Sequence, residues 1–312
     1  MEQNVKHQIV EAVKNYMADN GLVQEAMADR AGVNVGYVNA LLQGNYFVKV
    51  KNKEIPVKDS YFVKLAKAVG YQVEKVYWHH VETCQYLQIQ TELLDAKSGG
   101  RTKMIIGETG CGKTYTVDKF VFSYPVNTFR ITVSDMHRLN DILEELCELM
   151  RIVPSGSRVS RLRKIAGKLK SIKDSGGKPI VIIDEAENLK LPALKMLKGF
   201  YDAIRAYASI VLIGTSQLTR KLEILEEKDV DGIPQFCRRF KAGKREIAEI
   251  RKDAMYAPFF ESIEDDHVRQ LVETLASNYG ELNDYLEPAL RDADRSGCAL
   301  NENFFRHLFG LI

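Results

Sequence analysis

The stretch that decides the fold is KMIIGETGCGKT, residues 103–114. Its first five residues form a short apolar run typical of a buried strand, and a helical pattern follows the loop. The loop matches the spacing G-x-x-x-x-G-K-[ST], in which glycines let the backbone wrap closely around phosphates. Successive backbone N–H groups and the N-terminus of the following helix then face the anion. The stretch therefore predicts a site for the phosphates of a nucleotide.

Individual residues of this loop have expected roles. Lys113 would reach the β- and γ-phosphates, and Thr114 would bind Mg²⁺. The predicted cofactors are therefore ATP and Mg²⁺. The predicted nucleotide-binding residues are Gly107, Glu108, Thr109, Gly110, Cys111, Gly112, Lys113, Thr114 and Tyr115.

A second apolar run, IVIIDE at residues 180–185, ends in two acidic residues. A carboxylate at such a strand end lies beside the metal of a nucleotide site, which is the role expected for Asp184. Glu185 would point elsewhere and act as a general base on the attacking water. The pair favours hydrolysis, since transfer to another phosphoryl acceptor would need no water-activating acid. We therefore predict an ATPase.

The alternation of short apolar runs with helical patterns predicts the fold class. The runs lie at residues 103–107, 128–133, 179–184, 208–214 and 245–250. Buried strands that alternate with helices predict an α/β fold with a parallel sheet flanked by helices.

The chain divides into three expected domains: residues 1–75 (all-α), 76–250 (the sheet and a linker helix at 81–97) and 251–312 (helical). In the last domain, helices are expected to start at Ser262, with Asp265 three residues on, and after Asn301.

Composition is that of an ordinary globular protein, with 45% hydrophobic and 28% charged residues. The five cysteines lie far apart without a C-x-x-C pair, which argues against a disulfide framework and a zinc site. The N-terminus lacks the apolar run of a signal peptide, and no stretch approaches the roughly 18 apolar residues that span a bilayer. We expect a cytoplasmic protein with no membrane partner.

Residues 24–42 read QEAMADRAGVNVGYVNALL and have the spacing of a helix-turn-helix. Gly32 would end the first helix with a left-handed backbone, and Asn34 would cap the second. The spacing resembles phage-repressor-like DNA-binding domains, in which the second helix would offer Tyr37, Asn39 and the nearby Gln43 to the major groove. Basic residues that could touch phosphates follow: Lys49, Lys51, Lys53 and Lys58. Because the second helix contains no Arg or Lys, a helical hairpin for protein contacts is the alternative.

Residues 151–178 contain nine basic residues and one acidic residue, Asp174. Apolar residues recur there at helical spacing and predict an amphipathic helix docked on the core: Val159, Leu162, Ile165, Ala166, Leu169 and Ile172. The charge imbalance predicts a phosphate-binding surface, with a solvated face as the alternative. The predicted DNA contacts are Arg158, Arg161, Arg163, Lys164 and Lys168, together with His137 and Arg138.

The two nucleotide motifs resemble those of AAA+ ATPases, whose fold ends in a helical lid. The resemblance implies that Thr215, after the run at 208–214, senses the γ-phosphate; an ordinary hydroxyl in a turn is the alternative. It also implies that an arginine of FCRRF (236–240), Arg239 or otherwise Arg238, reaches a neighbouring subunit's γ-phosphate. A basic turn or a DNA contact is the alternative there. The lids of this family often carry an arginine where this chain has Asn283.

The order of motifs along residues 20–300 resembles the B proteins of Mu-type transposable phages and TnsC-like transposition ATPases. The order is helix-turn-helix, Val81-Glu82-Thr83, GETGCGKT, basic helix, VIIDEAENL, IVLIGTS and FCRRF. The resemblance implies an ATPase that assembles with ATP as rings or helical filaments on double-stranded DNA, largely without sequence preference. It also implies that this homo-oligomer recruits and activates a transposase, with the basic helix holding the DNA backbone.

Two other functions fit the same motifs. A replicative helicase loader or initiator would use the same ATPase core. A nucleotide-gated transcriptional regulator would read one operator through its N-terminal domain, and it would protect a single palindrome rather than DNA in general.

Overall fold

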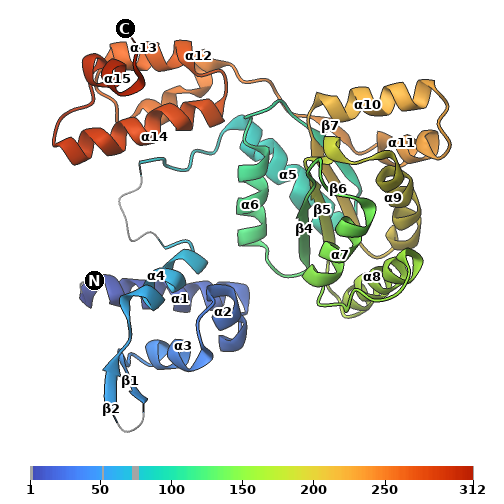
Figure 1. Cartoon of the computed structure of the whole chain (residues 1–312), viewed down its shortest axis with the longest axis horizontal. Helices are drawn as coiled ribbons and strands as arrows, with labels where there is room; N and C mark the ends of the chain where they lie inside the picture. The colour runs from blue at the N-terminus through green and yellow to red at the C-terminus, as the bar shows by residue number, and fades with distance from the viewer. Residues whose placement is uncertain (1–2, 51–52, 72–76, 312) are drawn as a thin grey trace. The chain divides into compact units, whose positions relative to one another are not determined.

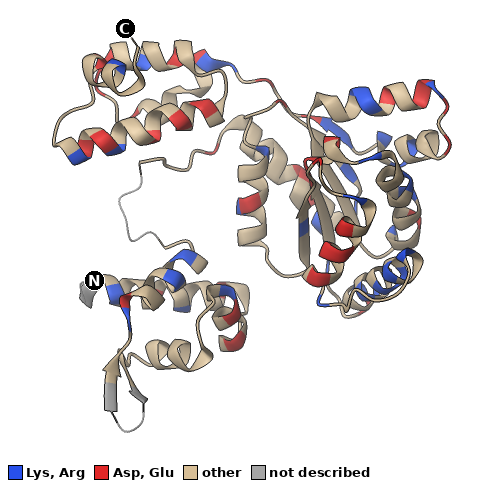
Figure 2. Ribbon diagram, in the orientation of Figure 1, with Lys and Arg blue, Asp and Glu red and all other residues tan. Residues whose placement is uncertain are grey.

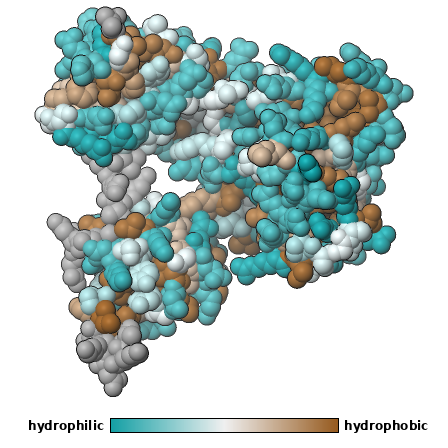
Figure 3. All heavy atoms as spheres, viewed as in Figure 1, coloured by the Kyte–Doolittle hydropathy of each residue, from teal (hydrophilic) through white to brown (hydrophobic). Residues whose placement is uncertain are grey.

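The computed structural model describes residues 3–50, 53–71 and 77–311. It divides into two compact units, Met1–Tyr77 and Trp78–Ile312, and each has apolar cores of its own. Most large apolar side chains are buried in these cores, so the visible surface is mainly hydrophilic with small separate apolar patches (Figure 3). Among the described residues, no helix combines the length and the apolar character that crossing a bilayer requires.

Helices dominate the N-terminal unit. They are α1 (Gln3–Asn20), α2 (Gln24–Ala31), α3 (Val35–Leu42) and α4 (Asp59–Ala68). The expectation of an all-α domain needs one correction, because β1 (Phe47–Val50) and β2 (Lys53–Pro56) form an antiparallel hairpin. The sequence VKVK at residues 48–51 alternates apolar and polar residues, which is a strand signal that the expectation of an all-α domain overlooked.

The turn between α2 and α3 has the local structure that the sequence predicts. Gly32 adopts φ +59°, and the Asn34 side chain accepts a hydrogen bond from the Gly36 N–H. Val38 and Leu41 are buried on the inner side of α3. That this helix pair binds DNA stays a prediction.

A five-stranded parallel sheet forms the centre of the second unit. Its strands are β3 (Lys103–Ile106), β4 (Thr128–Thr132), β5 (Ile180–Asp184), β6 (Ser209–Gly214) and β7 (Lys244–Glu246), in the order β4-β5-β6-β3-β7. The last strand is shorter and earlier than the run predicted at 245–250. Because the strands are parallel, the carboxyl ends of β3, β5 and β6 lie at one edge of the sheet.

Helices cover both faces of this sheet (Figure 1). One face packs on α5 (Cys84–Gly99) and α6 (Lys113–Ser123), and Ile105, Ile182 and Ile213 point toward them. The other packs on α7 (Leu139–Leu149), α8 (Arg158–Asp174), α9 (Leu191–Ile204), α10 (Ser216–Glu227) and α11 (Ile233–Lys241). The linker helix, predicted at 81–97, is α5 and begins only after the Thr83 cap.

The C-terminal helices pack around a third core of this unit. They are α12 (Lys252–Met255), α13 (Asp266–Leu275), α14 (Tyr279–Ser296) and α15 (Glu302–Phe309). Asn301 caps α15, as predicted. The cap of α13 is Asp265 rather than Ser262, because the Asp265 carboxylate accepts from the N–H groups of His267 and Val268.

Candidate nucleotide site

The glycine-rich loop joins β3 to α6 and is shaped by close contacts. Gly110 and Gly112 have φ of +75° and +87°. A Cβ on Gly110 would lie 2.2 Å from the Asn278 side chain, so this position needs glycine. Lys113 Nζ donates to the carbonyls of Gly107 and Glu108, both at 2.8 Å. The lysine thus folds over a loop whose backbone conformation suits a bound phosphate.

Two acidic residues at the end of β5 lie in different environments. Asp184 is 1% exposed, and its Oδ1 accepts from the Glu185 N–H at 3.0 Å. Glu185 is exposed and has a left-handed backbone with φ +52°. Its Oε2 accepts from Asn188 Nδ2 at 3.3 Å, and the same amide donates to the Val133 carbonyl at 2.8 Å. The two carboxylates are thus held apart, and their assignment to the metal and to the attacking water stays a prediction.

The residues present fit Mg²⁺ by their chemistry. Thr114, in the first turn of α6, offers an exposed hydroxyl, and Asp184 offers a carboxylate at the same edge of the sheet. Hydroxyl and carboxylate oxygens are the hard ligands that Mg²⁺ takes beside phosphate oxygens and water.

Arg130 contacts the candidate metal-side acid, and the sequence analysis did not single it out. From β4 its Nη2 donates to Asp184 Oδ2 at 2.8 Å, and its Nη1 contacts Asp118 of α6. The available signal was a lone arginine inside the apolar run TFRITV, which is unusual for a buried strand.

Thr215 follows β6 and is nearly buried. Its hydroxyl accepts from the Gln217 N–H at 3.3 Å and caps α10, while its own N–H donates to Glu187 Oε2 at 3.3 Å. The structure thus shows the ordinary turn role that the sequence allowed, and γ-phosphate sensing stays a prediction.

The two arginines of α11 differ in their contacts. Arg239 makes a bidentate ion pair with Asp202, in which the Nε–Oδ1 distance is 2.9 Å and the Nη2–Oδ2 distance is 2.7 Å. Its guanidinium also lies 5.7 Å from the centre of the Tyr201 ring. Arg238 is exposed beside it. The sequence favoured Arg239 for a contact across subunits, but this side chain is engaged within its own chain.

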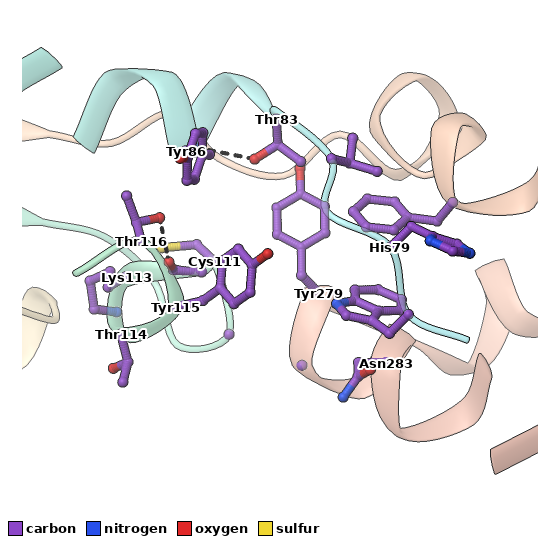
Figure 4. A pocket seen from close by; sticks show the side chains of 16 residues that line it. His79, Thr83, Tyr86, Cys111, Lys113, Thr114, Tyr115, Thr116, Tyr279 and Asn283 are labelled. Atoms are coloured by element: carbon purple, nitrogen blue, oxygen red, sulfur yellow. Dashed lines mark hydrogen bonds between the residues drawn. The ribbon is translucent and has the colours of Figure 1, made fainter. Parts of the chain in front are cut away.

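A cavity of about 270 Å³ adjoins the phosphate loop, and aromatic side chains form much of its wall (Figure 4). Cys111, Lys113, Thr114 and Tyr115 lie on one side of the view, and Tyr279 and Asn283 of α14 lie on the other. Tyr279 also ties the lid to the loop, since its N–H donates to the Gly110 carbonyl at 3.1 Å. The C-terminal segment of the same unit therefore forms one wall of the cavity.

The residues just before the linker helix also belong to this site. The sequence analysis gave no role to Trp78, His79 or His80, yet Trp78 and His79 line the cavity. Trp78 stacks on Phe259 with ring centres 4.7 Å apart. His80 Nδ1 lies 2.9 Å from the Tyr115 hydroxyl, and burial lowers the pKa of His80. Tyr115 thus faces the linker, and an aromatic-walled cavity beside a phosphate loop suits a nucleotide base.

Helix α8 carries the basic surface (Figure 2). Three of the five predicted contacts have partners nearby: Arg158 Nε donates to Asn140 Oδ1 at 2.8 Å, Arg161 lies 3.6 Å from Glu144, and Lys164 Nζ donates to Ser155 Oγ at 2.8 Å. The other two, Arg163 and Lys168, are exposed.

The apolar stripe of α8 is narrower than predicted. Ile165 and Leu169 are buried and anchor the helix, but Val159 is 57% exposed. In the turn after β4, Arg138 is exposed, and His137 Nδ1 accepts from the Ser134 N–H at 2.8 Å.

The predicted DNA contacts of the N-terminal unit are only partly accessible. Tyr37 is half-buried and stacks on Tyr61 with ring centres 4.6 Å apart. Asn39 and Gln43 are exposed and joined by a 3.0 Å hydrogen bond. Lys51 lies outside the described residues, as do the side chains of Lys49 and Lys53; Lys58 is exposed before α4.

Comparisons with known proteins agree with this geometry. Residues 96–222 match the family model of an AAA domain. The chain is 28% identical over 217 residues to the Mu-like prophage FluMu DNA transposition protein B of Haemophilus influenzae, which covers 69% of this chain and 72% of the relative.

Solved structures show the same fold. The ORC2 protein of Aeropyrum pernix, in ADPNP and ADP complexes, aligns with 76% of this chain and 69% of its own, with a TM-score of 0.54 and 15% identity. The ORC1 protein of the same organism, in complex with DNA, aligns with 76% and 66%, with a TM-score of 0.52 and 17% identity. The phosphate loop, the Asp-Glu pair, the sheet order and these similarities together show an ATPase with an AAA domain that is similar to a Mu-like transposition protein B.

Proposed function

We propose that this ATPase binds double-stranded DNA with little sequence preference, assembles on it with ATP, and recruits and activates a transposase. The relative that is a DNA transposition protein supports the transposition role. The observation that carries the DNA proposal is α8, because this helix brings exposed Arg163 and Lys168 into the same unit as the nucleotide site. Basic side chains that contact only phosphates bind DNA without reading its sequence.

In this proposal, residues of the phosphate loop and of the Asp-Glu pair contact the bound nucleotide, its metal and the attacking water. Lys113 leaves the carbonyls of Gly107 and Glu108 and binds phosphate oxygens instead. Thr114 and Asp184 would hold Mg²⁺, which would supply positive charge beside the phosphates. Glu185 orients the attacking water and accepts its proton. Trp78, Tyr279 and Phe259 enclose the base.

Assembly completes the site across subunits. Of the two candidate arginines we propose Arg238, because Arg239 is held by Asp202 while Arg238 is exposed. A guanidinium supplied by a neighbour stabilises charge that develops on the transferred phosphoryl group. Hydrolysis would then depend on assembly, and DNA that promotes assembly would stimulate it.

Negative-stain electron microscopy of the full chain on random-sequence duplex DNA tests the proposal. The samples compare ATP plus Mg²⁺, ADP plus Mg²⁺ and no nucleotide, with Lys113→Ala as the matched variant. We expect filaments or stacked rings on DNA with ATP only, and none with Lys113→Ala.

Discrete particles at one site, or DNA binding that ignores nucleotide, would contradict filament assembly and favour a transcriptional regulator. A pull-down of the candidate transposase with ATP-assembled and ADP-treated protein tests recruitment separately. We expect capture by the ATP-assembled form alone.

A further inference from the structure

The guanidinium of Arg130 forms an ion pair with Asp184, the carboxylate proposed to bind Mg²⁺. Arg130 pairs with Ile182 in the register of β4 and β5, so its side chain lies on the same face of the sheet as Asp184, two residues further on. Asp118 of α6 lies opposite on that face. The guanidinium thus joins a buried carboxylate to an exposed one, with side chains 1% and 61% exposed respectively.

Asp184 requires this partner when no metal is bound. Its Oδ1 is occupied by the Glu185 N–H, and its Oδ2 accepts from Arg130. A buried carboxylate without a compensating cation is strongly unfavourable. Arg130 therefore supplies the positive charge that Mg²⁺ would otherwise bring to this carboxylate.

Two features of Arg130 favour its release from Asp184. Its Nε is buried and has no hydrogen-bond partner among the described residues, so the present position is not the best one for the arginine itself. Asp118, on the exposed side, offers a second anchor that remains when Asp184 binds another cation.

We propose that Arg130 is a positioning residue that occupies Asp184 in the nucleotide-free protein and competes there with Mg²⁺. Arg130 then sets the Mg²⁺ concentration at which the chain binds nucleotide, and Asp118 sets how readily Arg130 moves away. This inference rests on the proposed Mg²⁺ site at Thr114 and Asp184.

The test is a Mg²⁺ titration of fluorescent-ATP binding to the full chain. For Arg130→Met we expect the half-saturating Mg²⁺ concentration to fall roughly tenfold, because a like charge near the metal has been removed. Asp118→Asn should shift it the opposite way, since Arg130 then depends on Asp184 alone. Arg130→Lys keeps the charge and should stay near wild type. Arg101→Met, which removes an exposed arginine paired with Asp95, is the matched control and should leave the value unchanged.

A second measurement is thermal unfolding without ligand and with Mg²⁺ plus ADP. Arg130→Met should unfold at a lower temperature than wild type without ligand, and Mg²⁺ plus ADP should close most of that difference. An unchanged or higher half-saturating Mg²⁺ for Arg130→Met would overturn the inference. If that variant does not fold, Asp118→Asn decides alone, and an unchanged or lower value overturns it. Wild-type binding that ignores Mg²⁺ would instead reject the proposed metal site.

Discussion

At the scale of single residues, Glu185 combines an exposed carboxylate with a strained backbone. A non-glycine residue at φ +52° is uncommon, and such strain often accompanies a functional position. The side-chain amide of Asn188 donates to the Glu185 carboxylate and to the carbonyl of Val133, which follows β4. The backbone and this amide together fix where the carboxylate points.

Glu185→Gln removes the base but keeps the size and backbone of the residue. We expect ATP hydrolysis to fall by about a hundredfold or more while nucleotide affinity is retained, because general-base catalysis contributes on that order. Steady-state hydrolysis and fluorescent-ATP titration measure the two quantities. Glu187→Gln is the control, since a glutamine oxygen can still accept from the Thr215 N–H. Hydrolysis by Glu185→Gln at the wild-type rate would show that another group activates water.

Lys97, in the last turn of α5, gives a pH-dependent prediction. Its ammonium donates to Val126 O, Thr128 Oγ1 and Lys178 O, and burial lowers its pKa from 10.5 to about 8. Between these values the unfolded chain binds more protons than the folded chain, so stability should rise with pH. Denaturant unfolding at pH 7.5 and at about pH 9.5 measures the free energy of unfolding of wild type and of Lys97→Met. We expect the stability of wild type relative to Lys97→Met to increase at the higher pH, and a constant or shrinking difference would contradict the burial effect.

At the scale of elements, the residues of α8 that pack on the core differ from the basic residues that we propose bind DNA. Ile165 and Leu169 hold the helix on the core, while Arg163 and Lys168 remain exposed. Charges on such a solvent-facing side can change without loss of the fold.

The double variant Arg163→Glu with Lys168→Glu should weaken binding to duplex DNA by tenfold or more at low salt. The slope of log affinity against log salt should fall in magnitude by about two, because two phosphate contacts are lost. Fluorescence anisotropy at several salt concentrations measures both. Arg295→Glu, an exposed reversal on α14, is the matched control and should bind as wild type. If both variants bind alike, α8 is a solvated face only.

At the scale of the whole molecule, our proposal has each nucleotide site receive Arg238 from a neighbouring subunit rather than from its own chain. Arg238→Ala and Glu185→Gln should each be inactive alone, and a mixture should regain hydrolysis. Recovery requires neighbours in which one subunit supplies the intact Arg238 and the other the intact Glu185. Hydrolysis measured across mixing ratios should peak near equal amounts. If the hydrolysis rate of the mixture is only the weighted mean of the rates of the two variants, Arg238 does not act on a neighbouring subunit's site.

The sequence by itself determined the local features of the candidate nucleotide site. The glycine spacing, Lys113, Thr114 and the Asp184-Glu185 pair were predicted because phosphate binding imposes a short, contiguous pattern between a strand and a helix. The parallel sheet and its flanking helices were also predicted, because buried strands and amphipathic helices have different apolar periods. The hairpin β1–β2 was missed because its four-residue strands carry few repeats of the period.

Only the tertiary structure decided which distant residues meet. Arg130 reaches Asp184 because β4 pairs with β5, and Trp78 meets Phe259 because the C-terminal helices fold over the linker. Arg239 and Tyr37 fit their motifs in sequence, yet packing places them against Asp202 and Tyr61. Such contacts join residues 24 to 181 positions apart, and strand order and packing determine them, whereas a sequence pattern reports only on neighbouring turns and strands.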